Sequence, residues 1–410
     1  MHVSLSFDDE RLDLDIPDDK LVGSWDGPQG LDPAAAAAAA REALDSPVEL
    51  PPVGRMVVAG DRVAIAWDSS LAGATPILHG LLERLTAAGV EVDDVVVVTT
   101  PGSSRSGPLD LPAGVAQEVH DPLHQDSLAY LAATKDGRRI YLNRRLTDAD
   151  VVIPVGRVGY DPILGYRGPW STLFPALSDV ETHRSYRNQL VEDPADQLKP
   201  APRWDESFEV GWLLGSQLQV GVIPGARGPA AVLAGLGDPL RGRAVEVLDK
   251  LWGYQVPSGA ECVVAGIGRP GSPSGLGELV DGLMTASRLV NHGGKILALS
   301  RASGDLGPSL RRLTSIDDVR KASAILRGHD DDVDSVSGRR LARVLSWADV
   351  YLLSGLDRGT VEDLSMVPVE GPDEARRLVS RSGACLVVSG ADLTRATVVE
   401  SREHSEGRIL

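Results

Sequence analysis

The stretch from Val151 to Asp179 reads VVIPVGRVGYDPILGYRGPWSTLFPALSD, and we expect the rest of the chain to converge on it. Its first five residues, β-branched apart from Pro154, predict a buried strand that opens into a loop. Ligands in open α/β sheets bind beyond the carboxyl ends of strands. The loop contains glycines, which allow close backbone approach to a ligand, together with polar and aromatic residues: Arg157, Tyr160, Asp161, Tyr166, Arg167, Trp170 and Ser171. The alternative is a surface loop with ordinary turn glycines.

The length of 410 residues is too great for one small core and predicts two α/β domains with mainly parallel sheets. We place them at residues 1–240, including the central loop 156–179, and at residues 241–410. The net charge of −17 argues against nucleic acid and anionic membranes as partners, because both require a surplus of basic residues. No apolar run is long enough to cross a bilayer and no secretion signal is present, so we expect a cytoplasmic protein. Both cysteines lie in strand-like apolar runs, where we expect no disulfide.

A βαβ unit precedes the central stretch. Residues 62–67 and 95–99 predict strands, and residues 76–88 predict the helix between them, which implies parallel strands with a right-handed crossover. Polar residues follow each strand end, namely Asp68, Ser69 and Ser70 after the first and Thr99, Thr100, Ser103, Ser104 and Arg105 after the second. Because the carboxyl ends of parallel strands meet at one edge, we expect both groups to lie beside the loop that follows Val155.

Other elements follow from simple patterns. Alternation of apolar and polar residues between Val3 and Val22 predicts a strand pair, and Asp32-Pro33 predicts the start of a helix through the following alanines. Further on, residues 262–266 predict a buried strand, followed by a glycine-rich loop at 268–275. That loop has the spacing of neither common nucleotide-binding motif, so we assign no nucleotide to it.

The usual catalytic and metal-binding motifs are absent. His120 and His124 would share one face of a helix as metal ligands, but Pro122 makes a continuous helix doubtful and favours a solvated turn, so we expect no metal. His183 is a candidate general base, with a surface histidine as the alternative. Arginines beside carboxylates at strand ends suit a small carboxylate or hydroxylated acid, which an arginine fork holds with two hydrogen bonds. Internal salt bridges among the same groups are the alternative.

The order of motifs along most of the chain resembles the nickel-pincer lactate racemase family. The matching segments are residues 14–23 (LDIPDDKLVG), 60–66 (GDRVAIA), 68–70 (DSS), 100–105 (TPGSSR), 120–121 (HD), 141–144 (YLNR), 150–153 (DVVI), 165–166 (GY), 173–175 (LFP) and 290–299 (VNHGGKILAL). Each match is modest, and their shared order carries the resemblance. The resemblance implies two α/β domains with a ligand cleft between them.

The resemblance also implies a chemistry that this chain departs from. Family members hold nickel with a pyridine-derived pincer nucleotide joined to a loop lysine, and invert a 2-hydroxy acid by transient hydride transfer with two further histidines. The alignment puts Ser171 at the lysine, Arg187 at the nickel histidine, and Ser104 and Asp161 at the acid/base histidines. Leu71 replaces a motif arginine, and Leu279 and Gly282 replace an assisting glutamine and lysine.

These departures predict a family member without the nickel-pincer cofactor, because serine offers no amine for the link and a protonated guanidinium cannot donate a lone pair to nickel. One interpretation is an isomerase, a racemase or epimerase of a 2-hydroxy acid or sugar acid. Its catalytic residues would be Asp161, Tyr160, His183 and Ser104, and its substrate-binding residues Asp68, Ser70, Arg105, Arg167, Ser171 and Arg187. The other is a catalytically silent homologue that binds a small carboxylate as a sensor or partner subunit. A third, that the cofactor residues are misaligned, would need Lys135 or Lys199 in place of Ser171. The sequence does not predict the oligomeric state.

Overall fold

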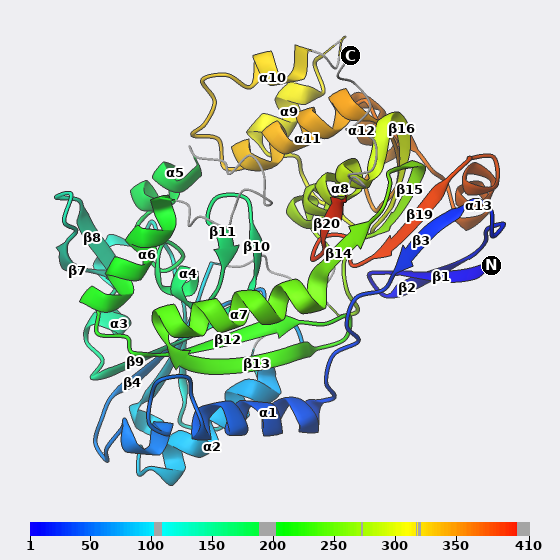
Figure 1. Cartoon of the computed structure of the whole chain (residues 1–410). Coiled ribbons are helices and arrows are strands. Elements are labelled where there is room, and N and C mark those ends of the chain that lie inside the picture. Colours follow the sequence, from blue (N-terminus) through cyan, green and yellow to red (C-terminus); the bar gives the residue numbers. More distant parts are fainter. Residues whose placement is uncertain (102–108, 188–201, 272–273, 317, 319–320, 400–410) are drawn as a thin grey trace, which may run out of the picture. The chain divides into compact units, whose positions relative to one another are not determined.

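The computed structural model describes residues 1–101, 109–187, 202–271, 274–316, 318 and 321–399, and the chain divides into two compact units (Figure 1). The middle unit is Pro28–Lys250, and the terminal unit combines Met1–Gly27 with Leu251–Leu410. We had placed the first residues in the N-terminal domain. They join the terminal unit instead, because β3 (Leu21–Trp25) pairs in parallel with β19 (Cys385–Ser389).

The described part of the middle unit contains a six-stranded sheet. Its order is β13 (Pro229–Leu236), β12 (Leu218–Pro224), β9 (Val151–Arg157), β4 (Val63–Trp67), β5 (Val95–Thr99) and β6 (Ala116–Val119). Neighbouring strands from β12 to β6 are parallel, and β13 is antiparallel to β12. Every residue of β4 is buried, because α1 (Pro33–Asp45) and α2 (Thr75–Ala87) cover one face and α4 (Pro169–Leu173) packs on the other. Asp32 caps α1 as predicted, accepting from the Ala35 amide at 2.8 Å.

The central stretch, predicted as a loop, is more ordered than expected. After β9 it forms a hairpin of β10 (Gly159–Asp161) and β11 (Gly165–Arg167), and then α4. Gly165 has φ +80°, a left-handed conformation that favours glycine and closes the hairpin turn. The unit is completed by η1 (Val53–Arg55), η2 (Val92–Asp94), η3 (Gln125–Ser127), the β7 (Leu128–Ala133) and β8 (Arg139–Asn143) hairpin, α3 (Arg144–Thr147), α5 (Val180–Arg187), α6 (Pro202–Leu213) and α7 (Gly237–Trp252).

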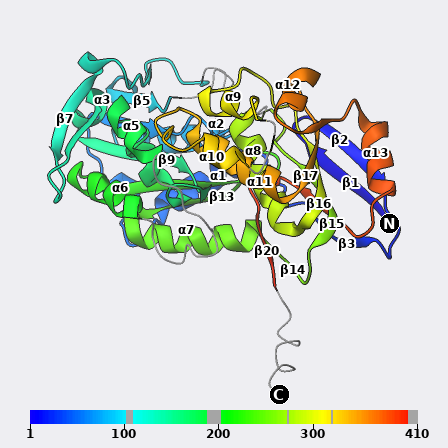
Figure 2. The same cartoon turned by 90° about the horizontal axis from the view of Figure 1, so that it is seen from above.

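The terminal unit has a parallel sheet in its described residues, in the order β18 (Val367–Pro368), β17 (Asp349–Leu353), β16 (Val290–Leu299), β15 (Ala260–Gly266), β19 and β3 (Figure 2). One face packs on α8 (Leu276–Leu289), α9 (Pro308–Leu313) and α11 (Ser335–Trp347). The other face packs on the β1 (His2–Phe7) and β2 (Glu10–Asp15) hairpin and on α13 (Pro372–Ser380). The remaining elements are α10 (Ala322–Ile325), α12 (Arg358–Asp363), and β14 (Gly253–Val256) paired with β20 (Arg395–Val398).

The two cysteines lie in neighbouring strands of this sheet. Cys262 of β15 and Cys385 of β19 are in register, and both are buried free thiols. They belong to the apolar cluster under the β1–β2 hairpin, which agrees with the prediction that each packs as a small hydrophobe.

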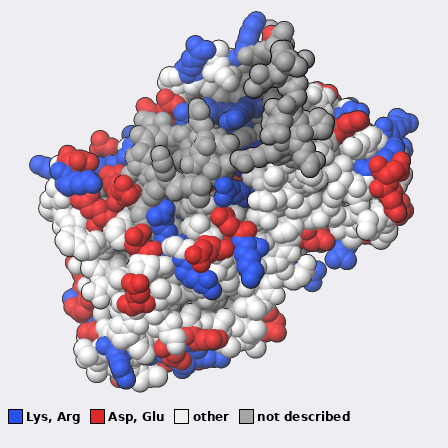
Figure 3. Space-filling view, in the orientation of Figure 1, with Lys and Arg blue, Asp and Glu red and all other residues white. Residues whose placement is uncertain are grey.

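The surface has charges of both signs. Figure 3 shows acidic and basic side chains scattered over the face that it displays. None of the helices in the described ranges combines the length and the apolar character needed to span a membrane.

Candidate functional site at the strand ends of the middle unit

Polar residues from four segments meet where the parallel strands of the middle unit end. Trp67 of β4 pairs with Val155 of β9 on one side and with Thr99 of β5 on the other. The residues that follow are joined by backbone hydrogen bonds, from Asp68 N to Val155 O at 3.0 Å and from Thr100 N to Trp67 O at 2.9 Å. The polar groups predicted from these strand ends therefore share one edge. We call this edge the strand-end rim, formed by Asp68, Ser69, Ser70, Thr100, His120 and Arg157.

Asp68 is the carboxylate of the rim, accepts several hydrogen bonds and is only 3% exposed. Its Oδ1 accepts from the Ser70 amide at 2.9 Å and the Ser70 hydroxyl at 2.7 Å. Its Oδ2 accepts from the Arg157 amide at 3.1 Å and from Arg167 Nη2 at 2.8 Å. Burial raises the pKa of Asp68, but the charges of Arg167 and Arg157 and the bonds from Ser70 outweigh it and hold the pKa below its ordinary value. Asp68 is thus ionised at neutral pH and ties β4, β9 and β11 together.

A pair of hydroxyl groups lies next to Asp68. The Ser69 amide donates to Thr100 Oγ1 at 3.0 Å, and the two hydroxyl oxygens are 3.1 Å apart. This pair joins the ends of β4 and β5, and Thr100 is buried. Ser69 and Thr100 therefore place two hydroxyl groups at the rim next to Asp68.

The two hairpin residues predicted to be catalytic, Tyr160 and Asp161, have structural partners. The Tyr160 hydroxyl donates to Asp249 Oδ1 on α7 at 2.8 Å, and the Tyr166 hydroxyl lies 3.4 Å from Asp249 Oδ2. Asp161 Oδ1 accepts from the amides of Ile163 and Leu164, both at 2.8 Å. Asp161 therefore shapes the hairpin turn, while Asp249 anchors the hairpin to α7.

Ser171, which the resemblance places at the cofactor lysine, is enclosed in the first turn of α4. Its hydroxyl donates to Gly168 O at 2.7 Å and accepts from Gly168 N at 3.2 Å, and the residue is buried. A Cβ atom at Gly168 would collide with the ring of Trp170, so this close turn needs glycine. The Ser171 side chain thus holds the backbone of the turn.

His183 lies on α5 and is partly buried. Its Nε2 atom is buried and has no hydrogen-bond partner among the described residues. Burial, followed by the charges of His120 and Arg187, lowers the pKa of His183, and hydrogen bonding to the backbone of Pro175 and Ala176 opposes this only in part. The ring is therefore neutral at pH 7, with the electronic state that a general base requires.

His120 differs from the solvated turn residue that the sequence suggested. It is 2% exposed, and its Nδ1 accepts from Asn143 Nδ2 at 3.2 Å while its Nε2 donates to Ser178 O at 2.8 Å. The tautomer is assigned from these partners, since an amide nitrogen can only donate. Burial lowers the pKa of His120, so the ring is neutral. No group of three or more histidine, cysteine, aspartate or glutamate side chains among the described residues is arranged to hold a metal ion.

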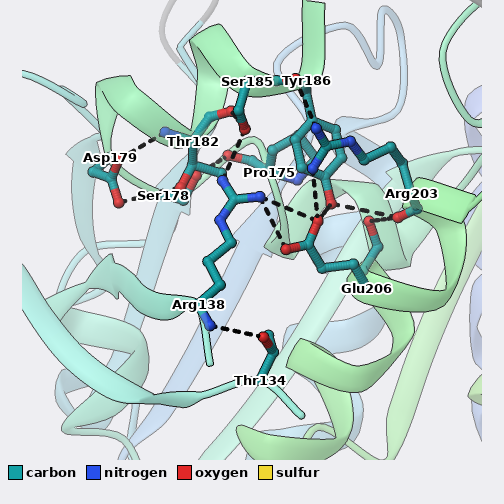
Figure 4. A network of polar contacts seen from close by, with 11 residues as sticks. Thr134, Arg138, Pro175, Ser178, Asp179, Thr182, Ser185, Tyr186, Arg203 and Glu206 are labelled. Atoms are coloured by element: carbon teal, nitrogen blue, oxygen red, sulfur yellow. Dashed lines mark hydrogen bonds and ion pairs between the residues drawn. The ribbon is translucent and has the colours of Figure 1, made fainter. Parts of the chain in front are cut away.

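A polar network that the sequence did not predict anchors α5 to its neighbours (Figure 4). Glu206 of α6 accepts from Arg138 Nη1 at 2.9 and 3.2 Å, from the Tyr186 hydroxyl at 2.9 Å and from Arg203 at 3.2 Å. Burial and the neighbouring Glu206 charge raise the pKa of Tyr186, which stays protonated. Arg138 also donates to the Ser185 hydroxyl at 2.8 Å. These bonds fix the helix that carries His183 and Arg187.

The predicted site residues thus fall into three groups. Asp68 bonds both Ser70 and Arg167, which is the internal pairing given above as the alternative to ligand binding at these residues. Asp161 and Ser171 bond within their own turns, Tyr160 bonds α7, and His183 and Arg187 lie on α5. Ser104 and Arg105 lie outside the described residues.

Comparison with known proteins shows which domain model and which solved structures this chain is similar to. Residues 7–198 match the family model of the lactate racemase N-terminal domain. The lactate racemase apoprotein from Thermoanaerobacterium thermosaccharolyticum superimposes with a TM-score of 0.76 at 15% identity, covering 98% of this chain and 100% of that one. A structural-genomics protein from Thermotoga maritima gives a TM-score of 0.63 at 13% identity, covering 91% of this chain and 100% of its own. A search of curated proteins found no match. Residues 7–198 thus match the lactate racemase N-terminal domain, and the chain as a whole has the fold of the lactate racemase apoprotein.

Proposed function

We propose that this protein is a catalytically silent member of the lactate racemase family that binds a small hydroxylated carboxylate at the strand-end rim. The observation that carries the proposal is the state of Ser171. At the position that the resemblance assigns to the cofactor-linking lysine, a buried hydroxyl is bonded to both the carbonyl and the amide of Gly168. The side chain serves the backbone turn, and this chain supplies no amine there.

The other donors that the resemblance assigns to the nickel-pincer nucleotide do not fit that group either. Arg187 carries a guanidinium, which stays protonated and has no lone pair for nickel. The Oδ1 atom of Asp161 is already engaged by two backbone amides. A soft nickel site favours imidazole and sulfur ligands. We therefore propose that the protein works without this cofactor and derive no step through it.

Anion binding at the rim follows from its electrostatics. Two guanidinium groups act on the buried Asp68, and together with the Ser70 hydrogen bonds they overcome the effect of its burial on the pKa. A positive potential of this strength at a strand-end edge favours a carboxylate. The Arg167 side chain is 25% exposed and donates to Asp68 through Nη2, and an arginine fork can hold a carboxylate with two hydrogen bonds. Ser69 and Thr100 would bind hydroxyl groups of the same ligand.

One observation favours the second candidate, a cofactor-independent racemase or epimerase of a 2-hydroxy acid or sugar acid. His183 presents a buried, neutral Nε2 with an available lone pair. The α-hydrogen of a hydroxy acid is a very weak acid, and a base alone would exchange it only with strong stabilisation of the carbanion. Such an enzyme would exchange that hydrogen with solvent deuterium, and His183→Gln would abolish the exchange.

Calorimetric titration with lactate, glycerate and gluconate tests the proposal. We expect at least one of them to bind to the wild type. Arg167→Ala and Arg187→Ala should each weaken it at least tenfold while the protein stays folded. The control is Arg62→Ala, which removes an exposed arginine of the same unit paired with Asp150. Failure of all three acids to bind, or equal affinity in the Arg167 and Arg62 variants, would refute the binding site.

Metal analysis tests the catalytic part independently. We expect no stoichiometric nickel in protein produced together with the enzymes that make the cofactor. We also expect no deuterium incorporation at the α-carbon of any acid that binds. Nickel near one atom per chain would overturn the proposal, and His183-dependent exchange would transfer support to the second candidate.

A further inference from the structure

A polar pocket lies wholly within the terminal unit, at the amino-terminal ends of its parallel strands. It has a volume of about 260 Å³ and is lined by Glu261, Asn291, His292, Gly293, Gly294, Lys295, Arg381, Ser382 and Gly383. These residues come from β15, from β16 and from the turn that follows α13. The volume is below that of typical drug-sized sites, which suits a ligand of a few carbon atoms.

An irregularity in β16 forms one wall of the pocket. Ala260 pairs with Val290, and the next pair is Cys262 with Lys295, so Glu261 faces residues 291–294 across the register shift. Gly293 has φ +75°, and a Cβ atom at Gly294 would lie 2.8 Å from Glu261 O. Both positions therefore need glycine. Bulges of this kind redirect side chains next to functional sites, and here the bulge displays Asn291 and His292.

The charged groups of the pocket have no protein partner in the described ranges. Lys295, Arg381 and Glu261 form no side-chain hydrogen bond or ion pair with any described residue, although all three line one pocket. Elsewhere in the same unit, exposed arginines such as Arg358 and Arg376 pair with nearby carboxylates. The chain has a net charge of −17, so carboxylates are plentiful. Internal ion pairing nevertheless does not explain why Lys295 and Arg381 lie at the same pocket.

A structural role at the end of α13 does not account for these cations. Helix carboxyl ends attract basic side chains to their open carbonyl groups. Lys20 fills that role here, because its Nζ donates to Ser382 O at 2.9 Å and to Ser380 O at 3.4 Å. Neither Lys295 nor Arg381 takes part in it.

We propose that this pocket binds a small oxyanion that carries a neighbouring hydroxyl group. Lys295 and Arg381 would hold the anionic head, the lysine as a point charge and the arginine as a planar fork. Glu261 would accept the hydroxyl hydrogen, and its negative charge selects against an anion that has no hydroxyl to offer. Asn291 and the backbone amides at Gly293 and Gly294 supply further donors. The site is separate from the strand-end rim and does not depend on the function proposed there.

Calorimetric titrations of the full chain test the proposal with four probes. Glycerol 3-phosphate and glycerate carry an oxyanion and a hydroxyl, inorganic phosphate lacks the neighbouring carbon-bound hydroxyl, and glycerol lacks the charge. We expect binding of at least one of the first two, with weaker binding of phosphate and none of glycerol. The better of the two hydroxylated anions shows whether the head group is a phosphate or a carboxylate. If neither binds, or if phosphate binds as well as glycerol 3-phosphate, the inference is wrong.

Variants locate the binding. Lys295→Gln with Arg381→Gln should weaken the hydroxylated anion at least tenfold, and Glu261→Gln should weaken it several-fold without weakening phosphate. The matched control is Arg358→Gln with Arg376→Gln, which removes the same charge from exposed positions outside the pocket. Glycerate is also a candidate ligand of the strand-end rim, so its titration is repeated with the Arg167→Ala variant. That substitution should leave the affinity of the terminal-unit pocket for glycerate unchanged. Equal affinity in the pocket and control variants overturns the proposal, whatever the rim binds.

Discussion

Replacing Asp68 with asparagine should destabilise the middle unit strongly. The carboxylate accepts four hydrogen bonds, two at each oxygen, and an asparagine amide nitrogen can accept none. Whichever way the amide turns, one pair of donors from Ser70 or from Arg157 and Arg167 faces another donor. The partly buried guanidinium of Arg167 also loses its counter-charge.

The magnitude follows from burial. Breaking a buried ion pair by removing one partner costs about 3–5 kcal/mol, and we reduce this to about 2–4 kcal/mol because the Arg167 side chain is a quarter exposed. That is a large part of a typical stability of about 5–15 kcal/mol. For a unit of this size it corresponds to a fall in Tm of roughly 5–12 °C. Urea unfolding followed by circular dichroism measures it directly.

The effect should depend on pH with a defined sign. Because the folded pKa of Asp68 is lowered, its contribution to stability is present above the unfolded value of about 4 and is lost as the pH falls through the folded pKa. The gap between wild type and Asp68→Asn should therefore be constant from pH 6 to 8 and narrow below about 4. Asp150→Asn, at an exposed pair with Arg62 in the same sheet, is the control and should leave the unfolding midpoint unchanged. A free energy of unfolding for Asp68→Asn within about 0.5 kcal/mol of the wild type would refute the reasoning.

Three further predictions concern other buried groups. Glu206→Gln should lower the free energy of unfolding by about 1–3 kcal/mol, because Arg138 and Arg203 lose the carboxylate that they bind. The control is Glu246→Gln, which changes an exposed ion pair. Equal urea unfolding midpoints for the two variants would contradict a stabilising role of the network. Burial raises the pKa of Asp392 to about 6, so the ionisation of Asp392 destabilises the folded state increasingly as the pH rises from 4 to 6. Asp392→Asn should therefore raise the free energy of unfolding by about 1–2 kcal/mol at pH 7 and by almost nothing at pH 4. A lower free energy of unfolding for Asp392→Asn at pH 7 would contradict this prediction. Cys262 and Cys385 should react with a disulfide reagent only after unfolding in urea, because both are fully buried and because hydrogen bonding with Cys385, followed by burial, raises the pKa of Cys262. Labelling of the native protein at the rate of a free thiol would contradict this prediction.

The elements with strong periodicity could be predicted from the sequence. The βαβ unit, the Asp32 cap and the buried strand at Val151 follow from local patterns that burial and capping enforce. The hairpin inside the central stretch was not predicted, because its three-residue strands next to glycines have no distinct period. The prediction that the polar groups share one edge of the sheet is confirmed, because the carboxyl ends of neighbouring parallel strands all lie at the same edge.

The site could be predicted only as a list of residue types, because its connections run between segments far apart in the sequence. Nothing near Tyr160 indicates that Asp249, on a later helix, accepts its hydroxyl hydrogen. Likewise, His120 is held in its buried position by Asn143 at the end of β8. From the sequence alone, a histidine two residues before a proline was expected to lie in a solvated turn. Pairing across such separations is set by the tertiary fold, which a motif does not encode.

The role of Asp68 indicates which polar residues the stability of this fold requires, whatever reaction the protein performs. Asp68 joins the ends of β4 and β9 to β11, so its loss would cost stability in any member that uses the same hydrogen bonds, whether or not a reaction follows. Ser171 and Asp161 also satisfy backbone groups of their own turns. Stability therefore needs an acceptor or a donor at these positions but needs neither an amine nor an imidazole. A shared fold consequently describes the scaffold, and the reaction must be argued from the side chains that the scaffold presents.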